Sequence, residues 1–307
     1  MYDIIVVGGG PAGMTAALYA QRNGKQALVI EKQGFGGQIT HSPKVENYPG
    51  TMHMSGNDFA DRLLEQILAQ GAEIEFETVT AVEDLGDRKV VVTEEGSRFE
   101  GRAVVLATGV KHRMLGLEGE EALVGEGISF CAVCDGDFYA NQAVCVAGGG
   151  NSALQEAVLL AEKCREVVIL QDLPALTGEQ RLQDVLAARD NVRVICDTKI
   201  DRILINDGAF AGLEIESRST GEKQTLVCDG LFVAIGLIPE NEPFSTLADL
   251  NAWGYFDCDE RCETRTPGVY VAGDCRAKGV RQLATAIADG ATAALAACRY
   301  QIGRAHV

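Results

Sequence analysis

Basic residues are scarce in this chain of 307 residues. Lys and Arg total 27 against 44 Asp and Glu, a net charge of −17. Such a balance argues against a general binder of nucleic acid or of anionic membranes. The chain also lacks an apolar run long enough to cross a bilayer, and residues 1–7 enter a strand without the basic region of a signal peptide. We therefore expect a cytoplasmic protein.

Disorder is not expected either, because 47% of the residues are hydrophobic. The ten cysteines are mostly isolated, which fits reduced thiols in a cytosolic protein better than a secreted disulfide framework. Only Cys131 and Cys134 have redox spacing, so that one sulfur can attack an external disulfide while the other resolves the mixed disulfide. The alternative, half of a zinc site, would need Cys258 and Cys262, which are far away in sequence; no metal is expected.

A glycine-rich turn follows the apolar strand predicted at residues 4–7. In the run 8–13, Gly8 permits a tight turn, Gly10 lets the backbone approach a pyrophosphate, and Gly13 lets a helix at 14–23 pack on the strand. A second strand at 26–30 ends in Glu31, which lies 23 residues after Gly8 and can accept hydrogen bonds from a ribose. This pattern predicts a dinucleotide-binding fold.

The same plan recurs in the middle of the chain. A strand is predicted at 143–147, a glycine turn at 148–153, a helix at 154–163 and a strand at 166–170. The segment ending at 231–236 resembles the earlier segment at 104–109. This duplication predicts an α/β protein with two Rossmann-like, three-layer domains.

Three further segments could contact a cofactor. They are the loop at 34–49, the Thr108-Gly109 turn after an apolar strand, and the run from Gly273 to a helix predicted at 282–300. A helix N-terminus there could direct amide groups at a polar ring edge. The loop could equally be irregular surface, and the helix plain core packing.

Together these motifs resemble the low-molecular-weight thioredoxin reductase family of flavoproteins, over nearly the whole chain. The position of the dithiol inside the second domain is typical of that family. The resemblance implies a split FAD-binding domain, 1–112 with 244–307, and an inserted nicotinamide-type domain, 113–243, that carries the dithiol. It also implies a homodimer and a rotation of the domains during turnover.

The resemblance further implies roles for single residues. Cys134 would be the flavin-proximal thiol, Cys131 would exchange with the partner's disulfide, and Asp135 would donate protons, which requires a raised carboxyl pKa. The residues expected to bind FAD are Gly8, Gly10, Pro11, Ala12, Gly13, Glu31, Lys32, Gly37, Gln38, Asn47, Thr108, Gly109, Gly273, Asp274, Arg281, Gln282 and Leu283. Those expected to bind a nicotinamide dinucleotide are Gly148, Gly150, Asn151, Ser152, Gln171 and Asp172.

The end of the strand at 166–170 departs from the family pattern. NADPH-using members carry a run of arginines there, whereas this chain has Gln171, Asp172, Leu173 and Thr177, with no Lys or Arg between Glu166 and Gln180. A carboxylate repels a 2′-phosphate but accepts a hydrogen bond from a free 2′-hydroxyl. NADH is therefore favoured over NADPH. The alternative is a vestigial nicotinamide site, with ferredoxin or reduced flavin as the donor.

The predicted function is an FAD-dependent dithiol–disulfide oxidoreductase that passes two electrons to thioredoxin or a similar small redox protein. A second possibility is a dithiol oxidase that passes electrons to oxygen. A third, from another class, is a flavin-loaded redox sensor or binding module with little turnover.

Overall fold

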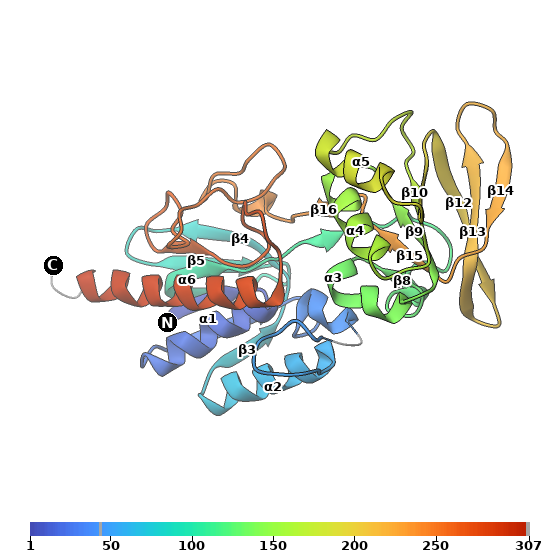
Figure 1. Ribbon diagram of the computed structural model, residues 1–307. Coiled ribbons are helices and arrows are strands. Elements are labelled where there is room, and N and C mark those ends of the chain that lie inside the picture. Colours follow the sequence, from blue (N-terminus) through green and yellow to red (C-terminus); the bar gives the residue numbers. More distant parts are fainter. Residues whose placement is uncertain (43–44, 305–307) are drawn as a thin grey trace. The chain divides into compact units, whose positions relative to one another are not determined.

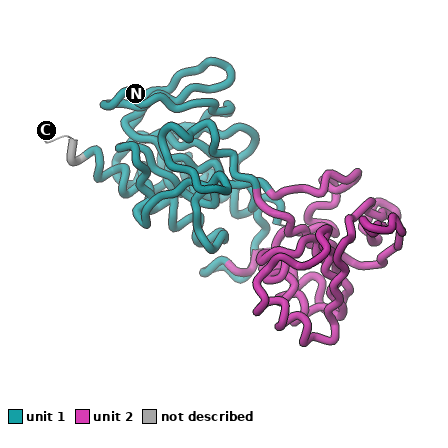
Figure 2. Tube along the Cα trace, turned by 90° about the horizontal axis from the view of Figure 1, so that it is seen from above, with its two compact units in different colours: residues 1–43, 48–111, 238–307 teal, residues 44–47, 112–237 magenta. Residues whose placement is uncertain are grey.

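The computed structural model describes residues 1–42 and 45–304. The chain forms two compact units, which Figure 2 distinguishes by colour. Unit 1 comprises Met1–Pro43, Tyr48–Lys111 and Ile238–Val307, and unit 2 comprises Lys44–Asn47 and His112–Leu237. The assignment of residues 1–112 with 244–307 to FAD and of 113–243 to a nicotinamide cofactor stays a prediction. Within the described part of the chain, no helix has the length and apolar character needed to cross a membrane.

Unit 1 is built on one sheet with helices against it (Figure 1). Its strands are β1 (Tyr2–Val7), β2 (Ala27–Glu31), β3 (Glu73–Phe76), β4 (Val79–Asp84), β5 (Lys89–Thr93), β6 (Arg98–Leu106) and β17 (Val269–Val271). Its helices are α1 (Pro11–Arg22), α2 (Gly56–Ala69) and α6 (Leu283–Arg304), with 3-10 turns η1 (Gly37–His41) and η4 (Glu242–Phe244). The short strands β7 (Lys111–His112) and β16 (Leu237–Ile238) pair with each other where the chain passes between the units.

The sheet of unit 1 runs in the order β3-β2-β1-β6-β5-β4. Its β3, β2, β1 and β6 are parallel, whereas β4 and β5 form an antiparallel extension. The long strand β6 serves both parts, because its first half pairs with β5 and its second half pairs in parallel with β17. The carboxyl ends of β1, β6 and β17 therefore meet at one edge, which is where ligands bind in open α/β sheets.

Both faces of β1 are buried. Ile5 and Val7 belong to a core cluster with Phe244 and Phe256. A Cβ on Gly13 of α1 would lie 3.1 Å from Val6, on the opposite face. Helices α1 and α6 pack side by side (Figure 1), and a Cβ on Gly290 of α6 would lie 2.1 Å from the carbonyl oxygen of Ala12. Glycine thus sets the close approach of these two helices.

Unit 2 repeats the parallel sheet and adds a small antiparallel one. Its strands are β8 (Ile128–Ser129), β9 (Ala143–Ala147), β10 (Glu166–Leu170), β11 (Val192–Ile195), β12 (Thr198–Asn206), β13 (Ala209–Ser217), β14 (Lys223–Leu226) and β15 (Gly230–Val233). Its helices are α3 (Ala132–Asp135), α4 (Asn151–Ala161) and α5 (Gln180–Ala187), with 3-10 turns η2 (Glu121–Leu123) and η3 (Gly136–Tyr139).

The parallel sheet of unit 2 has the order β11-β10-β9-β15-β8. Val144 and Val146 of β9 pack with α4 residues, whereas Cys145 and Ala147 face the cluster that includes residues of β12, β13 and β14. Two layers therefore cover this sheet, as the duplicated sequence predicts. The α/β fold class with two dinucleotide-binding-type domains is confirmed.

Helix boundaries differ from prediction in one consistent way. Helices α1 and α4 begin at Pro11 and Asn151, three residues earlier than predicted, because Gly10 and Gly150 are extended N-cap residues and the last residues of each glycine turn are already helical. Proline at the first helical position suits this start, since the helix needs no amide hydrogen there. The short helix α5 was not predicted.

Candidate active site

The first glycine turn is held by backbone contacts that leave no room for side chains. Gly8 has a φ of 108°, and a Cβ there would lie 2.3 Å from the carbonyl oxygen of Ala107. A Cβ on Gly13 would lie 1.9 Å from the carbonyl oxygen of Gly8. At Gly10, by contrast, a Cβ would meet no heavy atom within 4 Å. Backbone atoms therefore pack tightly against Gly8 and Gly13, whereas the space beside Gly10 is open. A pyrophosphate bound at a helix N-terminus requires this arrangement.

Glu31 is fixed at the end of β2 by two main-chain amides. Its Oε2 accepts a hydrogen bond from Gly9 N at 2.6 Å, and its Oε1 accepts one from Gln33 N at 2.9 Å. A carboxylate held in this way beside the turn suits the ribose-binding role. Lys32 is engaged elsewhere, because both Lys32 and Lys111 pair with Glu240.

The segment from Gly273 to Leu283 packs against the same turn. A Cβ on Gly273 would lie 2.8 Å from Cβ of Ala12. Arg281 is held by its Nε to the carbonyl oxygen of Asp274 at 3.3 Å and stacks over the ring of Tyr255 at 4.2 Å. Because Leu283 is the first residue of α6, this helix begins just after the motif. The segments around Gly8, Ala107 and Gly273, far apart in sequence, thus converge on one edge of the sheet.

Asn241 was missed by sequence reasoning. It is fully buried, accepts a hydrogen bond from Thr108 Oγ1 at 2.8 Å, and donates to the carbonyl oxygens of Gly254 and Cys275 at 2.9 and 3.0 Å. It therefore holds the Thr108-Gly109 turn against the C-terminal segment. Of the other predicted FAD-binding residues, Gly37 and Gln38 begin η1 and Asn47 belongs to unit 2.

The turn in unit 2 reproduces that in unit 1. A Cβ on Gly148 would lie 2.6 Å from the carbonyl oxygen of Ala234, just as a Cβ on Gly8 would clash with that of Ala107. Gln171, at the position that corresponds to Glu31, is 4% exposed and lies against Gly149. Its amide therefore points inward, and Asp172 is the first exposed side chain beyond the strand.

Two contacts at this turn could not be read from the sequence. Asn151 exchanges two hydrogen bonds with Glu179, at 3.1 and 2.7 Å. Asp172 pairs with Arg218, whose Nη2 lies 3.2 Å from its Oδ2. The absence of Lys and Arg between residues 166 and 180 therefore does not leave Asp172 without a basic neighbour, because Arg218 comes from the turn after β13.

The dithiol lies in and beside the short helix α3. Cys131 and Cys134 are joined by a disulfide, with their Cα atoms 5.3 Å apart, and Cys131 Sγ accepts a hydrogen bond from Cys134 N at 3.2 Å. Val133, between them, is 48% exposed. Cys131 and Cys134 are each only partly buried, so together with Val133 this segment has an exposed face on which a disulfide exchange can take place.

Asp135 directly follows Cys134 in the chain and is 8% exposed. Its Oδ2 accepts a hydrogen bond from Ser129 Oγ at 2.6 Å, and Ser129 Oγ in turn accepts one from Cys131 N at 3.1 Å. The Oδ1 atom is buried without a hydrogen-bond partner among the described residues. Burial raises the pKa of Asp135, while the Ser129 hydrogen bond opposes the rise. A carboxyl in this state can hold a proton, and Ser129 links it to the backbone of Cys131, as its predicted role requires.

Glu156 is a second acid beside the dithiol and was not foreseen. It projects from α4 and accepts a hydrogen bond from Ala132 N, in α3. Burial raises the pKa of Glu156 to about 7; the Ala132 hydrogen bond lowers it and the charge of Asp135 raises it. The sequence signal was weak, since a Glu inside an amphipathic helix is usually solvated. Two carboxyls with raised pKa values therefore adjoin Cys131 and Cys134.

The other closely spaced pair, Cys258 and Cys262, has no such features. Cys258 Sγ accepts a hydrogen bond from Arg276 Nε at 3.0 Å, and Cys262 is fully buried. Burial raises the pKa of Cys262 to about 12, so its thiol does not ionise near neutral pH. The two residues contribute to the structure of unit 1.

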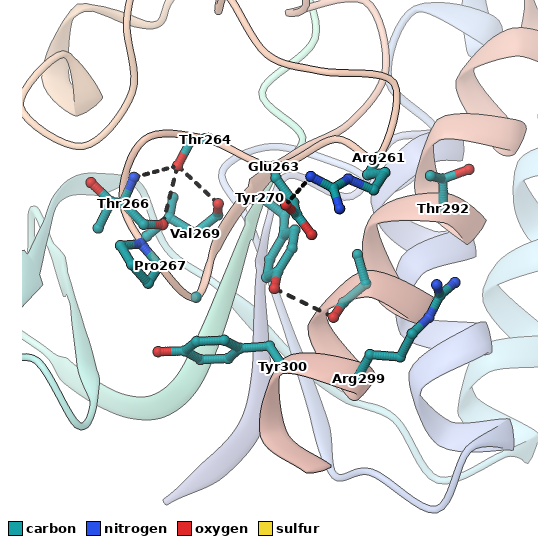
Figure 3. Close-up of a pocket in the computed structure, with 12 residues that line it drawn as sticks. Arg261, Glu263, Thr264, Thr266, Pro267, Val269, Tyr270, Thr292, Arg299 and Tyr300 are labelled. Atoms are coloured by element: carbon teal, nitrogen blue, oxygen red, sulfur yellow. Dashed lines mark hydrogen bonds and ion pairs between the residues drawn. The ribbon is translucent and has the colours of Figure 1, made fainter. Parts of the chain in front are cut away.

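A pocket of about 500 Å³ lies elsewhere in unit 1 (Figure 3). Arg261, Tyr270 and Arg299 are among its lining residues, and none of the residues predicted for the site is. It lies where β17 begins and α6 approaches its end, whereas Gly273 follows β17 and Leu283 begins α6. The pocket is therefore separate from the edge where the glycine turn lies.

Comparison with known proteins places these features in a family. The model of the pyridine nucleotide-disulphide oxidoreductases matches residues 2–290. The chain belongs to this family. Thioredoxin reductase of Listeria monocytogenes is 38% identical over 98% of this chain and 94% of its own. A 34.2 kDa protein in the rubredoxin operon of Clostridium pasteurianum is 38% identical, over 98% of each chain.

A solved structure agrees with this assignment. The crystal structure of thioredoxin reductase from Streptococcus pyogenes has a TM-score of 0.93 and 37% identity, over 99% of each chain. As a pyridine nucleotide-disulphide oxidoreductase, the protein is a flavoprotein enzyme of the thioredoxin reductase type, with FAD and a nicotinamide dinucleotide as the family's cofactors. The glycine turns fit these groups, because both are closed below by backbone contacts and unit 1 is open at Gly10.

Proposed function

We propose that this protein is an FAD-dependent thioredoxin reductase that uses NADH in preference to NADPH. The observation that carries the proposal is the Cys131–Cys134 disulfide, which lies beside two carboxyls with raised pKa values in the unit that contains the second glycine turn. FAD, when bound to unit 1, would supply a store of two electrons that it takes from the nicotinamide cofactor. All other steps fall to side chains of this chain and of the partner.

Disulfide exchange follows from the geometry of α3. In the reduced pair, the Cys131 thiolate attacks one sulfur of the partner's disulfide and displaces the other as a thiolate. Cys134 then attacks Cys131 Sγ, which re-forms the Cys131–Cys134 disulfide and releases the partner as a dithiol. Two electrons and two protons pass to the partner, and the buried carboxyl of Asp135 can supply one of these protons. Exposed Val133 lies on the face that the partner would approach.

NADH is preferred because Asp172 is the exposed group at the end of β10, where an acidic residue accepts the ribose 2′-hydroxyl. Ferredoxin or reduced flavin is the alternative donor. The dinucleotide-type turn at Gly148 favours the nicotinamide. By the same family resemblance we propose a homodimer, which sedimentation of the purified protein would test.

An anaerobic titration of the yellow protein distinguishes the donors. NADH, NADPH and reduced ferredoxin are added separately while the flavin absorbance is followed. We expect bleaching by NADH at concentrations about tenfold or more below those needed with NADPH. Equal bleaching by both nucleotides, or bleaching by ferredoxin alone, would exclude the NADH preference.

Paired assays distinguish the reactions. Reduction of thioredoxin with NADH as donor supports the proposal. Oxygen uptake with small dithiols, in the absence of thioredoxin reduction, would instead identify a dithiol oxidase. If both activities persisted after Cys131 and Cys134 were replaced by serine, the dithiol chemistry would be refuted.

A further inference from the structure

Arg218 lies beside Asp172 although 46 residues separate them. The guanidinium Nη2 is 3.2 Å from the carboxylate, and both side chains are about half exposed, at 51% and 55%. Such exposed ion pairs contribute little to stability. The position of the pair, at the end of the strand that follows the second glycine turn, therefore matters more than its strength.

Main-chain hydrogen bonds fix the place from which Arg218 reaches Asp172. Asp197 N donates to the carbonyl oxygen of Leu173 at 2.8 Å, and the carbonyl oxygen of Asp197 accepts from Arg218 N, also at 2.8 Å. The Asp197 carboxylate accepts from Ser219 N at 3.1 Å. The loop after β10 and the turn after β13 are thus joined through Asp197, so the Arg218 backbone is anchored beside that loop.

The pair occupies the place where dinucleotide-binding folds distinguish their cofactors. Gln171 is buried against Gly149, so Asp172 is the first side chain free to face an adenosine ribose. At this position an acidic group accepts from a 2′-hydroxyl, whereas an arginine binds a 2′-phosphate through forked hydrogen bonds. The chain has one group of each kind here, and they are paired with each other.

We propose that Asp172 and Arg218 together determine whether the site binds an adenosine ribose with a free 2′-hydroxyl or one with a 2′-phosphate. Asp172 accepts the free 2′-hydroxyl and, by pairing with Arg218, keeps the guanidinium from binding a 2′-phosphate. This inference depends on the proposed use of a nicotinamide dinucleotide. Removal of Asp172 alone frees Arg218, so a single substitution moves the preference toward the 2′-phosphorylated cofactor.

Calorimetric binding to the oxidised, FAD-loaded, full-length protein tests this without turnover. The probes are adenosine 5′-monophosphate and adenosine 2′,5′-bisphosphate. We expect the wild type to bind the monophosphate about tenfold more tightly than the bisphosphate. We expect Asp172→Ser to bind the bisphosphate about tenfold more tightly than the wild type does. The double variant Asp172→Ser/Arg218→Ala should lose that gain. Arg202→Ala, which removes an exposed arginine paired with Glu214 on the same small sheet, is the matched control and should change neither affinity.

A bisphosphate affinity that does not rise in Asp172→Ser, or a rise that persists in the double variant, would overturn the inference while leaving NADH use intact. Failure of every variant to bind either probe would overturn both the inference and the nicotinamide donor; thioredoxin reduction by another donor would then still test the dithiol chemistry. Flavin absorbance and circular dichroism verify folding. Should Asp172→Ser fail to fold, Asp172→Asn removes the charge in the same shape and must give the same direction of change.

Discussion

The carboxyl of Glu156 should make the stability of the protein fall as the pH rises through the neutral range. Burial between α4 and α3 raises its pKa from 4.5 to about 7. Between these two pH values, the folded protein therefore holds a proton that the unfolded chain has lost. Stability then decreases with pH from about 4.5 to about 7, because the unfolded state binds fewer protons there. At pH 8 the full difference is present, and it amounts to about 3 kcal/mol.

Glu156→Gln removes this penalty and keeps an oxygen that can accept the hydrogen bond from Ala132 N. We expect the variant to match the wild type at pH 4.5 and to exceed it by about 2–4 kcal/mol at pH 8, with the difference growing in between. Urea unfolding at several pH values, followed by circular dichroism, measures it. Glu162→Gln, which removes an exposed carboxylate at the end of the same helix, should change stability by less than about 0.5 kcal/mol throughout.

The reasoning fails if the difference between Glu156→Gln and the wild type is the same at every pH, or if the variant is the less stable protein at pH 8. Either result would mean that the carboxylate is not penalised in the folded state. The same ionisation adds a negative charge beside Cys131 and Cys134 near pH 7. The pH profile of thioredoxin reduction should therefore differ between wild type and variant in this range.

Asp135→Asn should lower thioredoxin reduction about 10²–10⁴-fold, since the amide cannot deliver a proton; unchanged steady-state turnover would exclude that role. Single Cys131→Ser and Cys134→Ser variants should lose the reaction but keep the yellow colour of bound FAD, and absorbance spectra with activity assays show whether they do. Gly290→Ala should destabilise the protein by about 1–3 kcal/mol, because its Cβ would clash with the backbone of α1. Gly279→Ala, where a Cβ meets nothing within 4 Å, is its control in thermal unfolding, and equal midpoints for the two would contradict this packing.

Local patterns made much of the fold predictable. A strand, a glycine turn and a helix within about 30 residues specify a dinucleotide-binding unit, because backbone sterics alone dictate where glycine is needed. The duplication at Gly8 and Gly148 and the spacing of Cys131 and Cys134 follow from such local rules. The structure confirms the α/β class, and the comparisons confirm the family.

The pKa values and side-chain contacts of the site could not be predicted from the sequence. The burial of Asp135, the approach of Glu156 to α3 and the anchoring role of Asn241 depend on contacts between separate elements. A pKa depends on how much water and charge surround a group, and these are set by the packing of the whole unit. The chain itself shows an acidic residue, not its protonation state.

Asp172 illustrates the division most clearly. The order of residues along the chain is enough to predict an acidic side chain, and no Lys or Arg, at the end of β10, because Asp172 lies two residues after Leu170 in the covalent chain. That Arg218 reaches this carboxylate became visible in the folded chain alone, since sheet pairing and the hydrogen bonds of Asp197 join segments that are 46 residues apart. Motifs are local properties of a chain, whereas the partners of a side chain are properties of its fold.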